Sequence, residues 1–569
     1  MLVKHFTSKT IRTLVAAAAF SALTSLATAS TAADGKSHVG QSASGNYLAG
    51  RHAEEVGEDM AALSFYGDAT TRGQIATSDL YRRIYFLGLT EGRIDEALKA
   101  LDRVEKLGGR APFTTLVRAT HALKIKDYDR VHELLKDEST GLTGLLAPAL
   151  IAWAKAGQDD TDGALKALAK MKEKTALDAL HDLHAALIFE RAGDTKTAES
   201  HFLGVLEKAG MSVRVAQLLG WHFERLGQMS KARELYSKFT DDGEGAAMLA
   251  LAEARAKKKM RPPLDVATAE AGAAEALFNI ASVLQAQAGD DRVLVLAHLA
   301  LYLREDLDPA RIVIAAALET GTRYEDANAI YKRIPKSSPL SWNARMHTAD
   351  NLDRMGETDA SVKLLKALAR ERPDREAPLI ELGDVLRRHE RFKEAATAYS
   401  DAFKRIEKIE ARHWTLYYAR GIAYEQTKQW PKAEQDFLKA LSFDPDQPLV
   451  LNYLGYSWID QGLHLDRALK MIEQAVDLRP RDGYIVDSLG WGLYRLGKFD
   501  QAVKKMERAV MLRPADPVIN DHLGDALWRV GRKREARFQW ERSKALEPDA
   551  DLAKVIDQKL KDGLAAPSK

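Results

Sequence analysis

The chain has 569 residues, of which 46% are hydrophobic and 29% charged, a balance typical of a folded protein rather than a disordered or membrane-embedded one. Lysine and arginine total 83 against 81 aspartates and glutamates, and this near neutrality argues against nucleic acid as a partner. Cysteine is absent, which excludes thiol nucleophiles, cysteine-ligated metal sites and a cysteine-linked lipid anchor.

Residues 1–33 are predicted to be a secretory signal peptide. A basic start without acidic residues precedes a ten-residue apolar run at 14–23, too short to cross a bilayer, which takes about 20 residues. Two alternative A-x-A-like cleavage sequences follow at 27–29 and 30–32. The alternative interpretation is an alanine-rich first helix or an uncleaved anchor. We expect export to the bacterial periplasm, or to the periphery of the cell envelope, with no transmembrane segment after cleavage.

A repeat of 34 residues organises the C-terminal half. Glycine, alanine and proline recur at this interval in two successive units, as Gly490 and Gly524, Ala502 and Ala536, and Pro514 and Pro548. Upstream, Gly421 precedes Gly455 by 34 residues. Small residues let two antiparallel helices approach closely, and the proline ends the second helix. The pattern predicts an all-α solenoid of helix pairs.

The landmarks of this unit resemble the tetratricopeptide repeat, and that resemblance implies a right-handed superhelical solenoid. Weaker copies extend towards the N-terminus, for example Gly220 with Ala232 and Tyr236. The expected organisation is an N-terminal degenerate array over 45–255, a basic proline-containing linker over 256–269, a C-terminal array over 270–550 and a tail over 551–569.

The predicted linker contains three lysines, an arginine and two prolines within residues 257–263, a composition that does not suit a helix interior. The segment is predicted to be a hinge or loop between the two arrays. A solvated linker is the simpler interpretation of so short a charge run, and a binding site for an acidic partner is the alternative.

Residues that could carry chemistry do not form a recognisable set. The sequence has no phosphate-binding glycine loop, no G-x-S-x-G elbow and no H-E-x-x-H motif. His181 and His184 lie near one another on an expected helix, but no third ligand has metal-site spacing, which favours a packing or surface role. We therefore expect no catalytic residue, no cofactor and no metal, and so not an enzyme.

The first helix of each pair is expected to line a concave surface that binds partner proteins or peptides. Residues three before and one, four and five after the repeat glycine should face it. Their asparagine, aspartate, aromatic and arginine side chains are of types that could bind a peptide backbone or form hot spots. The alternative is that some aromatics pack between repeats. The candidate groove residues are Arg387, Arg388, Asn452, Tyr456, Asp487, Trp491, Tyr494, Arg495, Asp521, Asp525, Trp528 and Arg529.

The segments 451–458, 487–497 and 522–528 look like the C-terminal block of exported bacterial repeat adaptors, a resemblance that covers roughly 415–550. One such adaptor is an outer-membrane lipoprotein that binds a periplasmic C-terminal processing protease and delivers cell-wall hydrolases to it. The resemblance implies a non-catalytic adaptor with these partners, although this chain lacks the anchoring cysteine. A chaperone-like holder of exported proteins and a structural spacer in an envelope or secretion assembly are the alternatives.

Overall fold

The computed structural model describes residues 42–71, 76–173, 177–210, 212–238, 244–285 and 291–565, so the predicted signal peptide lies outside it. The described residues form α-helices and short 3-10 turns, with no strand among them. The all-helical paired-repeat fold predicted from the sequence is therefore confirmed. No helix in the described part is long and apolar enough to span a bilayer. The described residues divide into an N-terminal unit, 42–361, and a C-terminal unit, 362–565.

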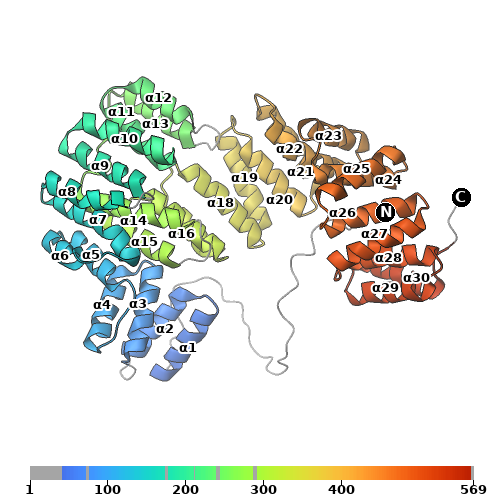
Figure 1. Cartoon of the computed structure of the whole chain (residues 1–569), viewed down its shortest axis with the longest axis horizontal. Coiled ribbons are helices and arrows are strands. Elements are labelled where there is room, and N and C mark those ends of the chain that lie inside the picture. Colours follow the sequence, from blue (N-terminus) through green and yellow to red (C-terminus); the bar gives the residue numbers. More distant parts are fainter. Residues whose placement is uncertain are drawn as a thin grey trace. The chain divides into compact units, whose positions relative to one another are not determined.

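The N-terminal unit consists mostly of short helices, and many of the described connections between them are tight turns (Figure 1). Successive helices pack as pairs, beginning with α1 against α2 and α3 against α4. The helices wholly within this unit are α1 (Ala43–Glu55), α2 (Asp59–Thr71), α3 (Ser78–Thr90), α4 (Ile94–Lys106), α5 (Thr114–Lys124), α6 (Tyr128–Leu135), α7 (Gly141–Gly157), α8 (Thr161–Ala169), η2 (Lys170–Glu173), α9 (Asp178–Ala192), α10 (Thr195–Ala209), α11 (Val213–Arg225), α12 (Met229–Ser237), α13 (Glu244–Lys257), α14 (Ala269–Leu284), α15 (Asp291–Leu303), α16 (Asp308–Thr320), α17 (Tyr324–Tyr331) and α18 (Ser341–Arg354).

Helices α14 and α15 turn back onto earlier helices of the same unit. Figure 1 shows them beside α5 and α7, and α14 packs against α5, α7 and α9 while α15 packs against α3, α4 and α5. At one crossing, a Cβ on Gly272 of α14 would overlap the Trp153 indole of α7, so glycine is required there. A later segment of the chain thus packs onto the first helix pairs.

The C-terminal unit repeats the same pairing more regularly. Helix α19 (Thr358–Glu371) contains the division between the two units. The helices that follow are α20 (Ala377–Arg388), α21 (Phe392–Arg405), η4 (Ala411–His413), α22 (Trp414–Gln426), α23 (Trp430–Phe443), α24 (Pro448–Asp460), α25 (Leu465–Leu478), α26 (Gly483–Arg495), α27 (Phe499–Leu512), α28 (Pro517–Arg529), α29 (Lys533–Ala545) and α30 (Ala550–Asp562).

The repeat glycines and alanines lie where the two helices of a pair approach closely, as their spacing predicts. Gly383 faces the Tyr399 ring and Gly421 faces the Phe437 ring, so each glycine leaves room for a large side chain of the second helix. The repeat alanines, such as Ala433 and Ala502, are fully buried. Between paired helices, turn glycines such as Gly497 adopt a positive φ of 75° that glycine tolerates without strain.

Two expected boundaries differ from those of the structure. The sequence placed the division at 256–269, but residues on both sides of that segment pack inside the N-terminal unit, because α14 returns onto α7. The expected tail over 551–569 instead contains helix α30. Its Leu552, Ile556 and Lys559 recur at helical spacing and are buried, which explains why the helix stays packed. Residues 566–569 lie outside the described part.

Candidate protein-binding surfaces

The first helices of the C-terminal repeats bring the candidate groove residues into register. Arg387 and Arg388 lie at the end of α20, and the others follow in α24, α26 and α28. Each helix begins with a local signal: a proline at its first position in α24 and α28, and in α26 Asp482, whose carboxylate accepts hydrogen bonds from the first-turn amides. The expected alignment of these positions from repeat to repeat is therefore present.

One row of positions remains accessible, and we call it the edge row. It consists of the candidates Arg388, Arg495 and Arg529 and of Asp460 at the same offset, each five residues after its repeat glycine. Arg495 is exposed and donates to Asp460 Oδ1 of the preceding repeat at 2.8 Å. Arg529 is half-buried and donates to the Tyr494 hydroxyl at 3.2 Å and to the Ala565 carbonyl at 2.6 Å. Contacts between repeats thus hold the last two guanidinium groups in place.

Four candidate residues are buried instead of lining an open surface: Asp487, Trp491, Asp521 and Asp525. The Trp491 indole stacks on His522, with ring centroids 4.2 Å apart, and on Tyr494 at 5.0 Å. His522 in turn lies 2.8 Å from Asp487 through Nδ1 and Oδ2. The expectation that these four side chains face a partner is wrong for this structure, because α24, α26, α28 and α30 lie close enough to enclose them.

Helix α30 supplies the cation that balances the last two carboxylates. Lys559 Nζ donates to Asp521 at 2.7 and 2.8 Å and to Asp525 at 2.8 Å. Burial lowers the pKa of Lys559, but Asp525 and Asp521 raise it more, so the net pKa is raised. Burial and Asp521 raise the pKa of Asp525 to about 6, although Lys559 opposes this. The cluster is an internal ion network that joins α30 to α28.

The side chains of the remaining candidates are half-buried. Arg387 donates to the Tyr399 hydroxyl at 3.2 Å and to Asp384 at 3.1 Å, so it belongs to its own repeat. Asn452 and Tyr456 are half-buried in α24. The Asn452 Oδ1 atom is enclosed and has no hydrogen-bond partner among the described residues. Trp528 is half-buried beneath Gly563, with Lys533 Nζ 5.1 Å from its ring.

The two histidines of α9 have separate structural contacts. The Nδ1 atom of His184 accepts a hydrogen bond from the Trp153 indole at 3.1 Å, and His181 lies 3.1 Å from Asp182. Burial lowers the pKa of His184 to about 4. The described part of the chain contains no group of three or more potential ligands suited to a metal ion. Both side chains therefore have packing roles.

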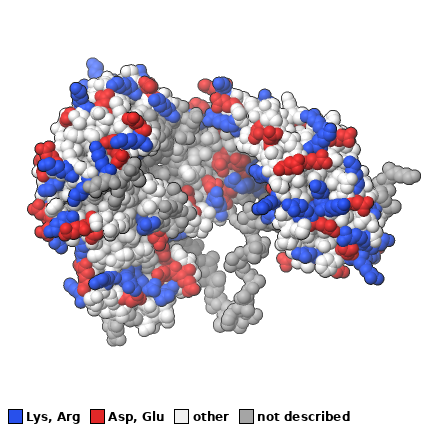
Figure 2. Space-filling view, viewed as in Figure 1, with Lys and Arg blue, Asp and Glu red and all other residues white. Residues whose placement is uncertain are grey.

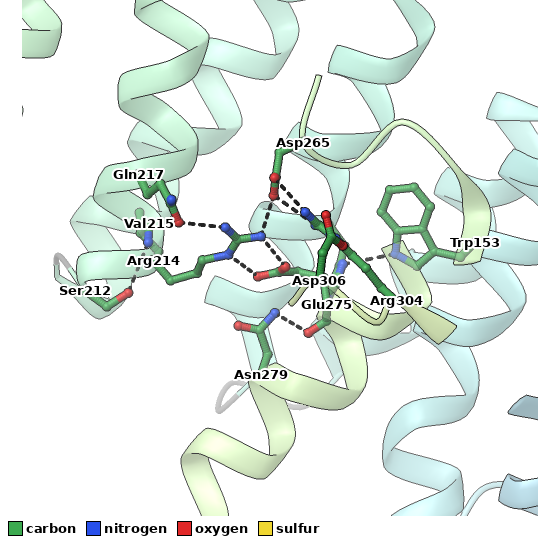
Figure 3. A network of polar contacts seen from close by, with 11 residues as sticks. Trp153, Ser212, Arg214, Val215, Gln217, Asp265, Glu275, Asn279, Arg304 and Asp306 are labelled. Atoms are coloured by element: carbon green, nitrogen blue, oxygen red, sulfur yellow. Dashed lines mark hydrogen bonds and ion pairs between the residues drawn. The ribbon is translucent and has the colours of Figure 1, made fainter. Parts of the chain in front are cut away.

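The N-terminal unit contains a buried ion network that the sequence did not predict (Figure 3). Arg214 of α11 donates to Glu275 of α14 at 2.7 and 3.0 Å and to Asp265 at 2.6 Å. Arg304 donates to both oxygens of the same Asp265, at 2.8 and 3.1 Å. Burial raises the pKa of Asp265, but the two guanidinium groups lower it more, so the carboxylate is charged. The network fixes residues 258–268 to α11 and α14.

A cleft of about 760 Å³ opens over this network. Its walls come from α11, α13, residues 258–268, the α15–α16 turn and the α17–α18 turn. The lining combines apolar residues such as Trp221, Leu264 and Leu340 with several arginines. A smaller cavity of about 490 Å³ shares Glu305, Arg311 and Arg333 with the cleft.

The cleft could not be predicted from the sequence because the residues that line it are far apart in the chain. One signal was present: residues 269–281 are apolar on almost every face, a pattern typical of a helix surrounded by protein. The structure buries nearly all of them. A helix enclosed in this way must pack onto other helices, which argues against an open array starting at residue 270.

Comparison with known proteins identifies the repeats of the C-terminal unit. Residues 380–448 and 488–551 match the family model of the tetratricopeptide repeat, so these segments are tetratricopeptide repeats. A TPR repeat-containing protein of Pseudomonas aeruginosa is 28% identical over 156 residues, which are 27% of this chain and 26% of the relative. The match therefore spans about a quarter of that relative's length.

Solved structures of the same fold class have low identity. A tetratricopeptide repeat protein from Parabacteroides merdae has 16% identity and a TM-score of 0.37, covering 44% of this chain and 96% of its own. YrrB, described as a TPR protein with an unusual peptide-binding site, has 19% identity and a TM-score of 0.27, covering 34% and 97%. The Cut9–Hcn1 structure has 14% identity and a TM-score of 0.37, covering 92% and 97%.

Proposed function

We propose that the chain is a non-catalytic scaffold that binds partner proteins or peptides, with the edge row of the C-terminal unit as a contact surface. The observation that carries this proposal is the shared register of Arg388, Asp460, Arg495 and Arg529 at the ends of the first helices α20, α24, α26 and α28. Arginine is enriched at protein interfaces, and the contacts between repeats hold Arg495 and Arg529 with little conformational freedom left to lose on binding.

The finer proposal concerns location and partner class. We propose that the chain is exported to the periplasm and delivers bound proteins to a processing protease. The basic and apolar start of the sequence, and the resemblance of 415–550 to exported adaptors, support this role. A holder of exported proteins and a spacer in an envelope assembly remain the alternatives, and the next experiment separates them from the adaptor.

The experiment is affinity capture from a periplasmic extract of the source organism, with an Arg495→Glu/Arg529→Glu bait beside the native bait. A matched control bait carries Lys504→Glu/Lys505→Glu, two exposed positions of α27, the second helix of a pair. Bound proteins are identified by mass spectrometry, and circular dichroism checks the helicity of each bait.

The scaffold proposal predicts a protein retained by the native and control baits and lost from the edge-row bait. A protease or cell-wall hydrolase with this pattern of retention supports the adaptor role. A broad set of unfolded exported proteins with the same pattern supports the holder. The same catch on all three baits, or no catch, overturns the edge row as a contact surface and favours the spacer.

A further inference from the structure

We propose that the cleft of the N-terminal unit is a second docking site, and that it takes an extended acidic peptide segment of a partner protein. This surface is separate from the edge row and does not depend on it. The cleft volume of about 760 Å³ falls within the range of roughly 300–1,000 Å³ that ligand pockets occupy.

The apolar part of the cleft suits side chains of an extended segment. Trp221 comes from α11 and Leu251 from α13, and Leu264, Leu307 and Leu340 come from three different connections. Prolines 263, 309, 335 and 339 add rigid apolar surface to the same lining. A surface built from turns with fixed backbones loses little entropy when a peptide docks on it.

The buried ion network makes the floor of the cleft rigid. Arg214, Asp265 and Arg304 all line the cleft, and Glu275 and Asp265 balance the two guanidinium groups (Figure 3). Arg255 is likewise neutralised, by Glu224 at 2.8 Å, while its guanidinium lies 6.0 Å from the Trp221 ring. These charges are satisfied internally and do not themselves call for a ligand.

The unpaired charge around the cleft is mostly positive, although Glu305 of the lining is also exposed without an ion pair to a described residue. Lys257, Lys258, Lys259 and Arg261 form an exposed run that continues directly into Pro263 and Leu264 of the lining. Arg333 lines both the cleft and the adjoining cavity. None of these five side chains has a hydrogen bond or ion pair to another described residue. Figure 2 shows acidic and basic side chains interspersed over much of the visible surface. Within residues 257–261, by contrast, four of the five side chains are basic.

An acidic peptide is the occupant that would match both the apolar lining and the basic side chains of the cleft. Its carboxylates would pair with the lysine run and with Arg333, and its apolar side chains would cover Trp221 and the leucines. A nucleic acid would meet only the charge requirement, because all the arginines that line the cleft except Arg333 are paired with carboxylates, and its prolines and leucines offer phosphates no donor.

The test uses two fluorescein-labelled peptides, one of repeating Glu-Leu-Pro units and one with glutamine in place of glutamate. Fluorescence anisotropy measures the affinity of each for the full chain, at low and at physiological ionic strength. The variants are Lys257→Glu/Lys258→Glu and, separately, Arg333→Glu. Lys504→Glu/Lys505→Glu is the control with the same change of charge.

We expect saturable binding of the glutamate peptide, at least about tenfold weaker for the Lys257→Glu/Lys258→Glu chain and unchanged for the control. Carbodiimide coupling of bound peptide should label Lys257, Lys258 or Lys259, as located by mass spectrometry. The Arg495→Glu/Arg529→Glu chain should bind the peptide normally, so failure of the scaffold proposal and failure of this one are distinguishable.

Three results would overturn the proposal. They are equal affinity for the glutamine peptide, equal loss in the Lys504→Glu/Lys505→Glu control, and absence of saturable binding to the native chain. Competition by a single-stranded oligonucleotide at lower concentration than the glutamate peptide would assign the cations to nucleic acid instead.

Discussion

The indole of Trp491 lies stacked on the imidazole of His522 in the next repeat, with ring centroids 4.2 Å apart and planes 21° apart. His522 also lies within hydrogen-bond distance of Asp487, so the three side chains form one buried unit between α26 and α28. Residues at positions that could have faced a partner therefore join successive repeats to each other.

The stability of the last repeats should depend on the protonation of His522. Burial lowers its pKa, but Asp487 and the carboxylates of Asp521 and Asp525 raise it more, and Lys559 belongs to the same cluster. Because the folded pKa is raised, the stabilisation is complete below the unfolded value of about 6.5 and is lost as pH rises through the folded pKa.

Hydrogen exchange of α26 and α28 in the native chain and in His522→Gln measures this dependence. The glutamine retains a donor for Asp487 but does not titrate. The difference in protection between the two chains should be larger near pH 6 than near pH 9. A difference that is the same at both pH values would show that the charge of His522 does not contribute.

Loss of the Lys559 ammonium should destabilise the C-terminal unit strongly. The change Lys559→Met leaves Asp521 and Asp525 as neighbouring buried carboxylates without their cation, a situation that typically costs about 3–5 kcal/mol. Urea unfolding followed by circular dichroism measures the change. Adding Asp521→Asn and Asp525→Asn to the Lys559→Met chain should recover part of the loss, and no recovery would contradict the ion network.

Two glycines at the same repeat position should differ in their tolerance of alanine. A Cβ at Gly524 would overlap the Trp540 indole, which is held by its hydrogen bond to Asp525 at 3.0 Å. A Cβ at Gly490 would lie 2.6 Å from Cγ of Met506, a flexible side chain that can move. Gly524→Ala should therefore cost about 1–3 kcal/mol and Gly490→Ala less, by urea unfolding. The opposite order would contradict the packing described.

Removal of the Arg214 guanidinium should loosen the return of α14. In Arg214→Met, Glu275 is fully buried without its ion pair, and such a change typically costs about 3–5 kcal/mol. Amide exchange should accelerate in α11, α14 and residues 258–268. The double change Arg214→Met/Glu275→Leu is the control, because it removes both charges. Equal exchange in the single and double variants would show that the unpaired carboxylate is not the cause.

Local spacing predicted the C-terminal repeats well. The distance from Gly490 to Ala502, and from Ala502 to Pro514, reflects helix length and turn position, which are properties of short segments. The paired helices α26 and α27 follow these marks closely. In the structure, Arg495 and Arg529 are the last residues of α26 and α28.

Contacts between distant segments could not be read from the same pattern. Whether Asp525 faces a partner or an internal cation depends on Lys559, which lies in a segment that looked like a tail. Whether residues 257–263 form a hinge depends on where α14 packs. The contact that holds α14 joins Arg214 to Glu275, which are 61 residues apart in the sequence. Periodicity reports the face that a helix buries, but not which helix covers it.

We propose that partners contact the edge row of the C-terminal unit, and site-specific photo-crosslinking in living cells tests this contact. The photoreactive residue p-benzoylphenylalanine replaces Arg388 or Arg495 on the edge row, or Lys504 or Lys505 of α27, in the full chain. We expect an adduct with a distinct partner protein from the edge-row positions and none from the α27 positions. Adducts of equal yield from both sets, or adducts from α27 alone, would contradict it.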